Sequence, residues 1–330
     1  MRAESARLAL ERCPDKATAD SLLERARELG LAANNNDKAR IAEAVDLAIV
    51  AHEYFRAVAD PRGIQRTLTW LSWLCTQGGD HLAAVRYARR ALRYVRHADD
   101  PEGATLYLEH SLAISYTRLQ DFVRAEDALR HVLAAADRRG DRRLAANAYF
   151  GLSRVYQKQG RIDESLGAAV RALRRFSRLD EQAVVAGLRN NIGMLLAERG
   201  DYARATGQLQ RALMAARKLG DVAVEANTLT ELARVSLRAG RIDSADGYAR
   251  QSLRLTLEVL HEEIRLARLY VVFAGIFEAR GEIERAAHYI DEAVELFEAN
   301  KNAQPDLVEF AAACACQQKL RRLVGKEGKQ

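Results

Sequence analysis

A glycine-containing turn recurs along this chain at an interval of about forty residues. The best-preserved copies are Gly160-Arg161-Ile162-Asp163, Gly200-Asp201-Tyr202 and Gly240-Arg241-Ile242-Asp243. Gly79-Asp80 and Gly281-Glu282 continue the series outward, and Gln120-Asp121 takes the place of a missing glycine. A fixed period of this length is typical of repeat architectures, in which each unit packs on its neighbours. The chain is therefore expected to be a stack of similar units.

Small residues follow the turns in step with this period. The first set is Ala44, Ala84, Ala125, Ser165, Ala205, Ala245 and Ala286, and the second is Ala51, Ala91, Val132, Ala172, Ala212, Ser252 and Ala293. Small side chains at regular helical spacing let neighbouring helices approach closely. We call these two sets the small-residue ladder, and we predict that they hold the helices of each unit together.

Composition and helix-end signals predict that every unit is a pair of helices. Ala, Leu, Arg and Glu dominate, only four prolines occur, and no segment alternates as a strand would. Gly140 and Gly220 suit a left-handed helix end, and the aspartate after each can cap the next helix. The aspartates expected to act as caps are Asp80, Asp121, Asp141, Asp201 and Asp221. The predicted fold class is all-α.

The segment from Asn190 to Ala205, continued by Leu209 and Ala212-Leu213, resembles a tetratricopeptide repeat. The long unit is similar to the extended class found in kinesin light chains, bacterial peptide-pheromone receptors and the sensory regions of bacterial signalling proteins. The resemblance covers about residues 20–300. It implies a right-handed α-solenoid with about six clear hairpins. A degenerate hairpin would precede them, with Asn34-Asn35-Asn36-Asp37 at its turn, and a capping helix opened by Gln304-Pro305-Asp306 would follow, to about residue 323. The expected domains are residues 1–63, 64–303 and 304–330.

In such a solenoid the first helix of each pair lines a concave face, where family members bind peptides or helices. The polar residues projected onto that face are Arg118, Asn147, Arg154, Lys158, Asn190, Asn191, Asn227, Arg234 and Arg238. Asparagine can bridge a peptide's N–H and C=O groups, and arginine offers forked donors to carboxylates. The favoured ligand is a peptide or helix of a partner protein, in particular an acidic or C-terminal-carboxylate peptide segment. The competing interpretation is a solvated face, because arginine is frequent throughout the chain and Glu198 and Glu231 lie nearby.

Nothing in the sequence resembles a catalytic or metal-binding motif. HExxH, GxSxG, P-loop and GxGxxG patterns are absent, and the seven histidines are scattered. The four cysteines form no CxxC pair, and no apolar run is long enough to span a membrane. We therefore expect a non-catalytic scaffold or adaptor without metal or cofactor. It would act in the cytoplasm, in bacterial signalling or regulation.

Two further functions stay open at this stage. The apolar segment Phe310-Ala311-Ala312-Ala313 could pair the C-terminal helices of a homodimer, although it could equally cover the last hairpin. Nucleic-acid association is the least favoured, because a formal net charge of +6 is modest. Its candidate residues are the stripes Arg86, Arg90 and Arg93, and Arg171, Arg174, Arg175 and Arg178 on second helices.

Overall fold

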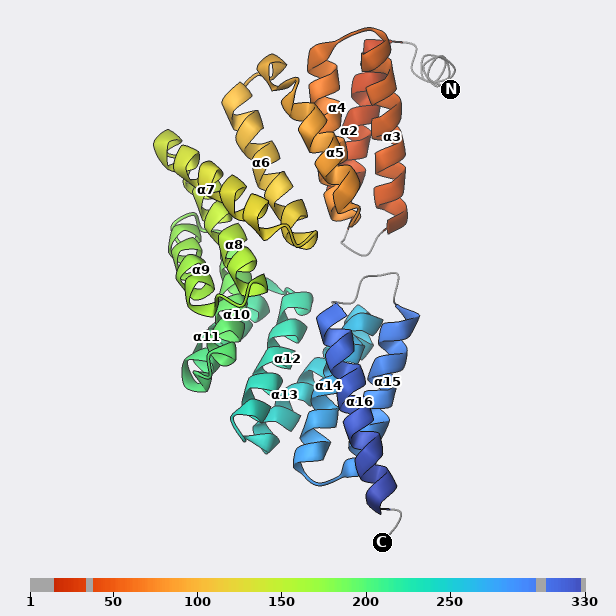
Figure 1. Cartoon of the computed structure of the whole chain (residues 1–330), viewed down its shortest axis with the longest axis vertical. Helices are drawn as coiled ribbons and strands as arrows, with labels where there is room; N and C mark the ends of the chain where they lie inside the picture. The colour runs from red at the N-terminus through yellow and green to blue at the C-terminus, as the bar shows by residue number, and fades with distance from the viewer. Residues whose placement is uncertain (1–14, 34–37, 301–306, 328–330) are drawn as a thin grey trace. The chain divides into compact units, whose positions relative to one another are not determined.

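The computed structural model describes residues 15–33, 38–300 and 307–327, and every regular element in these ranges is a helix (Figure 1). The α-helices are α2 (Lys16–Ala32), α3 (Lys38–Ala57), α4 (Pro61–Gln77), α5 (His81–Leu92), α6 (Pro101–Arg118), α7 (Phe122–Arg139), α8 (Arg142–Lys158), α9 (Ile162–Phe176), α10 (Gln182–Glu198), α11 (Tyr202–Leu219), α12 (Val222–Arg238), α13 (Ile242–Leu255), α14 (Glu263–Ala279), α15 (Ile283–Ala299) and α16 (Leu307–Glu327). A short 3-10 turn, Val95–His97, follows α5, and a π-helical turn, Thr256–Leu260, ends α13. The all-α prediction is confirmed.

The helices form two compact units, residues 1–168 and 169–330, and the boundary lies within α9. In the first unit each helix from α2 to α8 packs against the next one along the chain. The first helices α2, α4, α6 and α8 also contact one another in series. In the second unit, α10, α12 and α14 do the same. Within each unit, the first helices of successive hairpins therefore share one face.

The small-residue ladder lies in the helix interfaces. All of its members are buried. Ala84 is 1% exposed, and Ala44 and the other members are 0% exposed. The two serines are not left without partners, because Ser165 Oγ donates to the Ser153 carbonyl at 2.7 Å and Ser252 Oγ donates to the Ala226 carbonyl at 2.9 Å. The ladder prediction is confirmed, since only small side chains fit where helices approach this closely.

The aspartates predicted to cap helices do so. Asp80 accepts a hydrogen bond from the backbone N–H of Ala83 at 2.9 Å, and Asp141 accepts one from Leu144 at 2.8 Å. Equivalent contacts are made by Asp121, Asp201 and Asp221. Each contact satisfies a donor that the first turn of a helix would otherwise leave unpaired.

The C-terminal helix α16 packs against α15. Ala313 and Leu320 are fully buried, and the Phe310 ring lies 6.3 Å from that of Phe297. The helix continues to Glu327, so the expectation that it ends near residue 323 was wrong. Lys326 and Glu327 are good helix formers, and a single glycine at position 325 does not end the helix. The expected openings at Asn34-Asn35-Asn36-Asp37 and Gln304-Pro305-Asp306 lie outside the described residues.

Replacing Leu320 by alanine tests whether α16 stabilises the second unit. Removing a fully buried leucine side chain leaves a cavity, and we expect the free energy of unfolding to fall by about 3 kcal/mol. Chemical denaturation followed by circular dichroism measures the change. Gln318→Ala, at an exposed position of the same helix, is the matched control. Equal stability of the two variants would show that α16 does not act as a cap.

Replacing Gln120 by glycine tests a turn of the repeat in which the glycine is missing. Gln120 has φ 61°, in the left-handed region, where Gly160 has φ 74° in the following repeat. A non-glycine residue is strained there, so Gln120→Gly should raise the free energy of unfolding by about 1 kcal/mol. The reciprocal Gly160→Gln should lower it by a similar amount. Urea midpoints measure both changes, and a shift of the same sign in both variants would contradict the argument.

Candidate functional site

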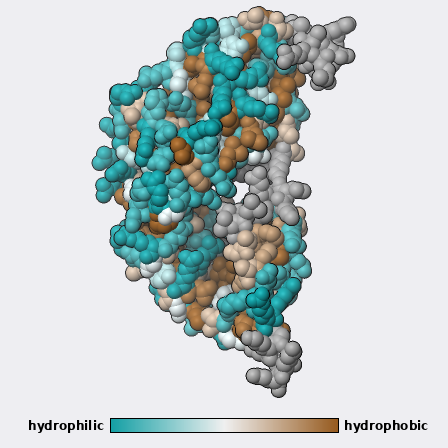
Figure 2. All heavy atoms as spheres, viewed as in Figure 1, coloured by the Kyte–Doolittle hydropathy of each residue, from teal (hydrophilic) through white to brown (hydrophobic). Residues whose placement is uncertain are grey.

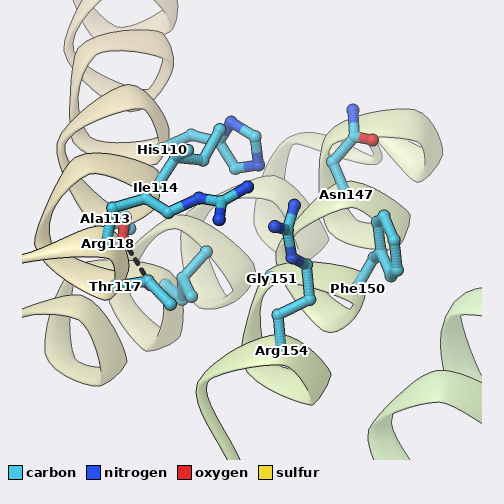
Figure 3. A pocket seen from close by; sticks show the side chains of 10 residues that line it. His110, Ala113, Ile114, Thr117, Arg118, Asn147, Phe150, Gly151 and Arg154 are labelled. Carbon is cyan, nitrogen blue, oxygen red and sulfur yellow. Dashed lines mark hydrogen bonds between the residues drawn. The ribbon is translucent and has the colours of Figure 1, made fainter. Parts of the chain in front are cut away.

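A recess of about 130 Å³ opens between the first helices α6 and α8 of the first unit (Figure 3). Its lining residues are His110, Ala113, Ile114, Thr117 and Arg118 from α6, Leu129 from α7, and Asn147, Phe150, Gly151 and Arg154 from α8. Cavities of about 150 Å³ hold a benzene-sized group, so the recess has room for one amino-acid side chain. It lies on the face that the sequence predicted for ligand binding.

The floor and one wall of the recess are apolar. Ala113 and Leu129 are buried beneath it, while Ile114 and Phe150 are half-buried at its sides. The Thr117 hydroxyl donates to the Ala113 carbonyl at 2.7 Å, so it is already bonded within α6. A Cβ atom at Gly151 would lie 2.7 Å from Leu129 Cδ2. The absence of a side chain at this position therefore keeps the floor open.

Two arginines supply the charge of the recess. Figure 3 shows the Arg118 side chain extending from α6 towards α8, with its guanidinium group beside that of Arg154. Neither arginine has a hydrogen-bond or ion-pair partner within the described ranges 15–33, 38–300 and 307–327. Loss of contact with water lowers the pKa of Arg154, and the nearby charge of Arg118 lowers it further. The recess therefore holds two like charges without a counter-charge.

A histidine and an amide complete the polar part of the recess. Burial lowers the pKa of His110, and a hydrogen bond with the Asn147 backbone opposes this shift without reversing it. His110 therefore stays uncharged near neutral pH, and the positive charge of the recess comes from the arginines. The Asn147 side chain lies on the α8 side of the recess and offers both donor and acceptor atoms.

The second unit has arginines on the same helix face, but they are neutralised. Arg234 occupies in α12 the repeat position that Arg154 has in α8, and its Nη1 lies 3.5 Å from Glu231 Oε1. Arg268 Nε of α14 lies 2.7 Å from Glu309 Oε2 of α16. Burial raises the pKa of Glu231, against the effect of Arg234. The position of Glu231 is taken in α8 by Gly151, so Arg154 lacks the neighbouring carboxylate that Arg234 has.

The other predicted residues lie outside this recess. Lys158 is exposed at the end of α8, and Arg238 is exposed at the end of α12. Asn227 accepts a hydrogen bond from Arg265 and is thus engaged within its own unit. Asn190 and Asn191 are adjacent on α10, and Asn190 Oδ1 and Asn191 Nδ2 are both buried without a hydrogen-bond partner among the residues that the structure describes. A partner-binding role for all of these residues stays a prediction.

The residues that form the apolar floor were not predicted. Ile114 lies one period before Arg154, at the position that Trp73 occupies in α4, so strict use of the repeat register would have included it. Leu129 comes from a second helix and carries no sequence signal for the first-helix face. Glu309 lies beyond the repeats, and only the packing of α16 brings it to Arg268.

Hydrophilic residues predominate on the face seen in Figure 2, with apolar residues in small clusters among them. The described part of the chain contains no group of three or more His, Cys, Asp or Glu side chains placed to hold a metal ion. Among its helices, none is long and apolar enough to cross a bilayer.

Replacing Arg154 by methionine tests the charge of the recess without a ligand. Met194 occupies this position one repeat later, so the substitution suits the fold. Relief of the repulsion with Arg118 should raise the free energy of unfolding by about 0.5 kcal/mol at low ionic strength, and added salt should remove the gain. Arg138→Met, at an exposed position of α7, is the control. A loss of stability in Arg154→Met would show that Arg154 has a compensating partner.

Comparison with known proteins agrees with this architecture. A family model described as "Tetratricopeptide repeat" matches residues 104–178 and 184–258. The regulatory protein AfsR of Streptomyces coelicolor is 30% identical over 197 residues, which cover 60% of this chain and 19% of that protein. The chain thus spans about a fifth of the length of this relative. The similarity therefore concerns only a segment of AfsR.

Solved structures share the fold at low sequence identity. The apo form of RapI aligns with a TM-score of 0.66 at 13% identity, covering 86% of this chain and 99% of RapI. A Rap protein complexed with Competence and Sporulation Factor aligns with a TM-score of 0.59 at 13% identity, covering 99% of both chains. The two matched segments, residues 104–178 and 184–258, are therefore tetratricopeptide repeats.

Proposed function

We propose that this chain is a non-catalytic regulatory scaffold of the bacterial cytoplasm that binds an acidic segment of a partner protein. The segment would lie along the first helices of the first unit, with an anionic group held between Arg118 and Arg154. The observation that carries the proposal is the recess itself, where two guanidinium groups face one another without a carboxylate. An arrangement that costs stability in the free protein is typical of a binding site.

The physical basis is charge complementarity. A guanidinium group carries five N–H donors in a planar fork, and hydrogen bonds to an ionised acceptor are about twice as strong as neutral ones. An anion between Arg118 and Arg154 would also remove their mutual repulsion. In the second unit Glu231 and Glu309 already provide such groups, so that face has less charge to offer an acidic ligand.

In the second unit, Asn190 and Asn191 are a separate candidate for contact with a ligand. The unpartnered Oδ1 of one and Nδ2 of the other form an acceptor and a donor on adjacent residues of α10. A buried amide atom without a partner costs free energy, and a ligand backbone could supply both missing hydrogen bonds after a small side-chain rotation. Such contacts would not depend on the ligand's sequence.

The names of the related proteins support a regulatory role. AfsR is named a regulatory protein, and one Rap protein was solved in complex with Competence and Sporulation Factor. We extend to this chain only the general idea that a solenoid of this kind regulates by binding a partner. The identity of the partner is not carried over.

The two alternatives have less support. A dimer through α16 would need its apolar side, but Ala313 and Leu320 already pack within the chain. Nucleic-acid binding would use the second-helix arginines, yet Arg90 approaches His52 Nε2 at 3.3 Å. Arg171 and Arg175 also interact within the chain. The apolar side of α16 is thus covered within the chain, and three of the second-helix arginines interact with other groups of the chain.

Co-purification with three forms of the full chain tests the proposal. The recess variant carries Arg118→Gln and Arg154→Gln, and the control carries Arg86→Gln and Arg138→Gln, which remove the same charge from second helices of the first unit. We expect quantitative mass spectrometry to find a partner that wild type and control retain and the recess variant loses by about tenfold or more. Raising the salt concentration should weaken the same partner.

Which variant loses the partner shows which surface binds it. A partner that the recess variant retains in full, while the control loses it, would place the functional surface on the second helices. Arg234→Gln with Arg238→Gln should have a smaller effect than the recess variant, because Glu231 already compensates Arg234. Circular dichroism of each variant confirms that the helices remain folded.

A further inference from the structure

We infer that His52 is a proton-sensitive clamp that holds the first hairpin, α2 and α3, against the second hairpin, α4 and α5. His52 lies on α3 and is buried. Its Nδ1 lies 3.0 Å from Thr67 Oγ1 of α4, and its Nε2 lies 3.3 Å from Arg90 Nη2 of α5. One side chain thus links three helices of two hairpins. This role does not depend on the ligand proposed above.

The partners of His52 decide which ring nitrogen carries the proton. Arg90 has only N–H donors, so the Nε2 of His52 must accept a hydrogen bond from it. The proton of the neutral ring is therefore on Nδ1, which donates to Thr67 Oγ1. The Thr67 hydroxyl in turn donates to the Gly63 carbonyl at 2.9 Å. This series requires a neutral ring, because a second proton would have to go on the nitrogen that accepts from Arg90.

The charges of α3 and α5 near His52 also oppose a second proton. Burial lowers the pKa of His52 to about 4, and the positive charges of Arg90 and Arg56 contribute to the shift. Glu53, the neighbour of His52 on α3, pairs with Arg56 at 2.5 Å. The carboxylate nearest to His52 along the chain is thus already engaged.

The other two helices at this junction do not compensate the ring. The group that α4 places at the ring is the uncharged Thr67 hydroxyl. On α2, Asp20 and Glu24 pair with Arg66 of α4 at 2.7 and 3.8 Å. Among the described residues of α2 and α4, none forms an ion pair with the ring. A protonated His52 would therefore face Arg90 within a buried interface.

The clamp lies in the packed contact between the two hairpins. Phe55, one turn after His52 on α3, is fully buried, and its ring leaves no room for a Cβ atom at Gly63 of α4. Thr67, one turn after Gly63, is also fully buried. Water can reach the ring only if α3 and α4 separate, so protonation favours a detached first hairpin.

The direction of the pH effect follows from the lowered pKa. In a detached, solvated hairpin the pKa of His52 would return to 6.5, so the detached state binds a proton more readily than the docked state. Docking is then at full strength above pH 6.5 and weakens as the pH falls towards 4. Between about pH 7.5 and about pH 5, the equilibrium constant for detachment should rise about 30-fold.

Detachment would uncover part of the first-helix face on α4. Trp70 and Trp73 are the chain's two tryptophans, and both lie against α2. The Arg27 guanidinium lies 5.7 Å from the centre of the Trp70 ring, and a Cβ atom at Gly30 would lie 2.8 Å from Trp73 Cζ3. Arg66 would lose its partners on α2. Tryptophan emission therefore reports on whether the first hairpin is docked.

Fluorescence and hydrogen exchange of the full chain test the clamp. Wild type is compared at about pH 7.5 and about pH 5 with His52→Gln and with His131→Gln, which changes an exposed histidine of α7. After correction for the intrinsic exchange rate, we expect α2 and α3 to lose protection about 30-fold at the lower pH in wild type and control, with a change in tryptophan emission. His52→Gln should change by about threefold or less. Equal losses in all three forms would overturn the inference.

Charge reversal at Arg90 separates a proton-sensitive clamp from a purely structural contact. Arg90→Glu would place a carboxylate beside Nε2, so the protonated ring gains a partner and the loss of protection should fall to about threefold or less. Arg86→Glu, at an exposed position one turn earlier on α5, is the matched control and should keep the wild-type response. A full wild-type response in Arg90→Glu would contradict the clamp.

Nuclear magnetic resonance of the ring nitrogens gives a readout that needs no variant to fold. In wild type at neutral pH, we expect the proton of His52 on Nδ1 and a pKa well below 6.5. A proton on Nε2, or titration at 6.5, would show that the ring is not held between Thr67 and Arg90.

Discussion

The close approach of helices at the small-residue ladder is the constraint on which the rest of the structure depends. Ala125, Ser165 and their counterparts are buried between helices. Larger side chains at these positions would force the helices apart. Their period keeps each hairpin in the same register as the one before, which brings first helices into contact with one another. Arg118 and Arg154 come from successive repeats, and this stacking alone makes them neighbours. The site is a consequence of the packing rule that builds the fold.

The repeat also shows how one position can serve different purposes. Arg154 and Arg234 are equivalent in the period, but Glu231 lies beside Arg234 while Gly151 stands in the corresponding place next to Arg154. Exchanging a carboxylate for a glycine removes a counter-charge and opens the floor at the same time. A scaffold whose hairpins are structurally alike can thus acquire one charged recess without changing its backbone.

Much of the fold could be predicted because its signals are local and repeated. The ladder, the aspartate caps and the turn at Gln120 all follow from which residues fit a helix interface, a helix start or a left-handed turn. The candidate site was predicted less well. Arg118, Asn147 and Arg154 were chosen by their helix face, yet Asn227, chosen in the same way, bonds to Arg265. Assigning residues to a helix face from the sequence gives the direction of each side chain. It does not show which side chain of another helix contacts it.

The sequence by itself determined the repeat period, the all-α class and which helices come first in each pair. These properties depend on spacing along the chain, which the order of residues states directly. Only the tertiary structure decided that Arg268 is neutralised, because Glu309 reaches it through the packing of α16, and that Leu129 closes the recess from a second helix. Both contacts join residues that are far apart in the chain. The uncompensated pair at Arg118 and Arg154 became visible only once the helices were stacked.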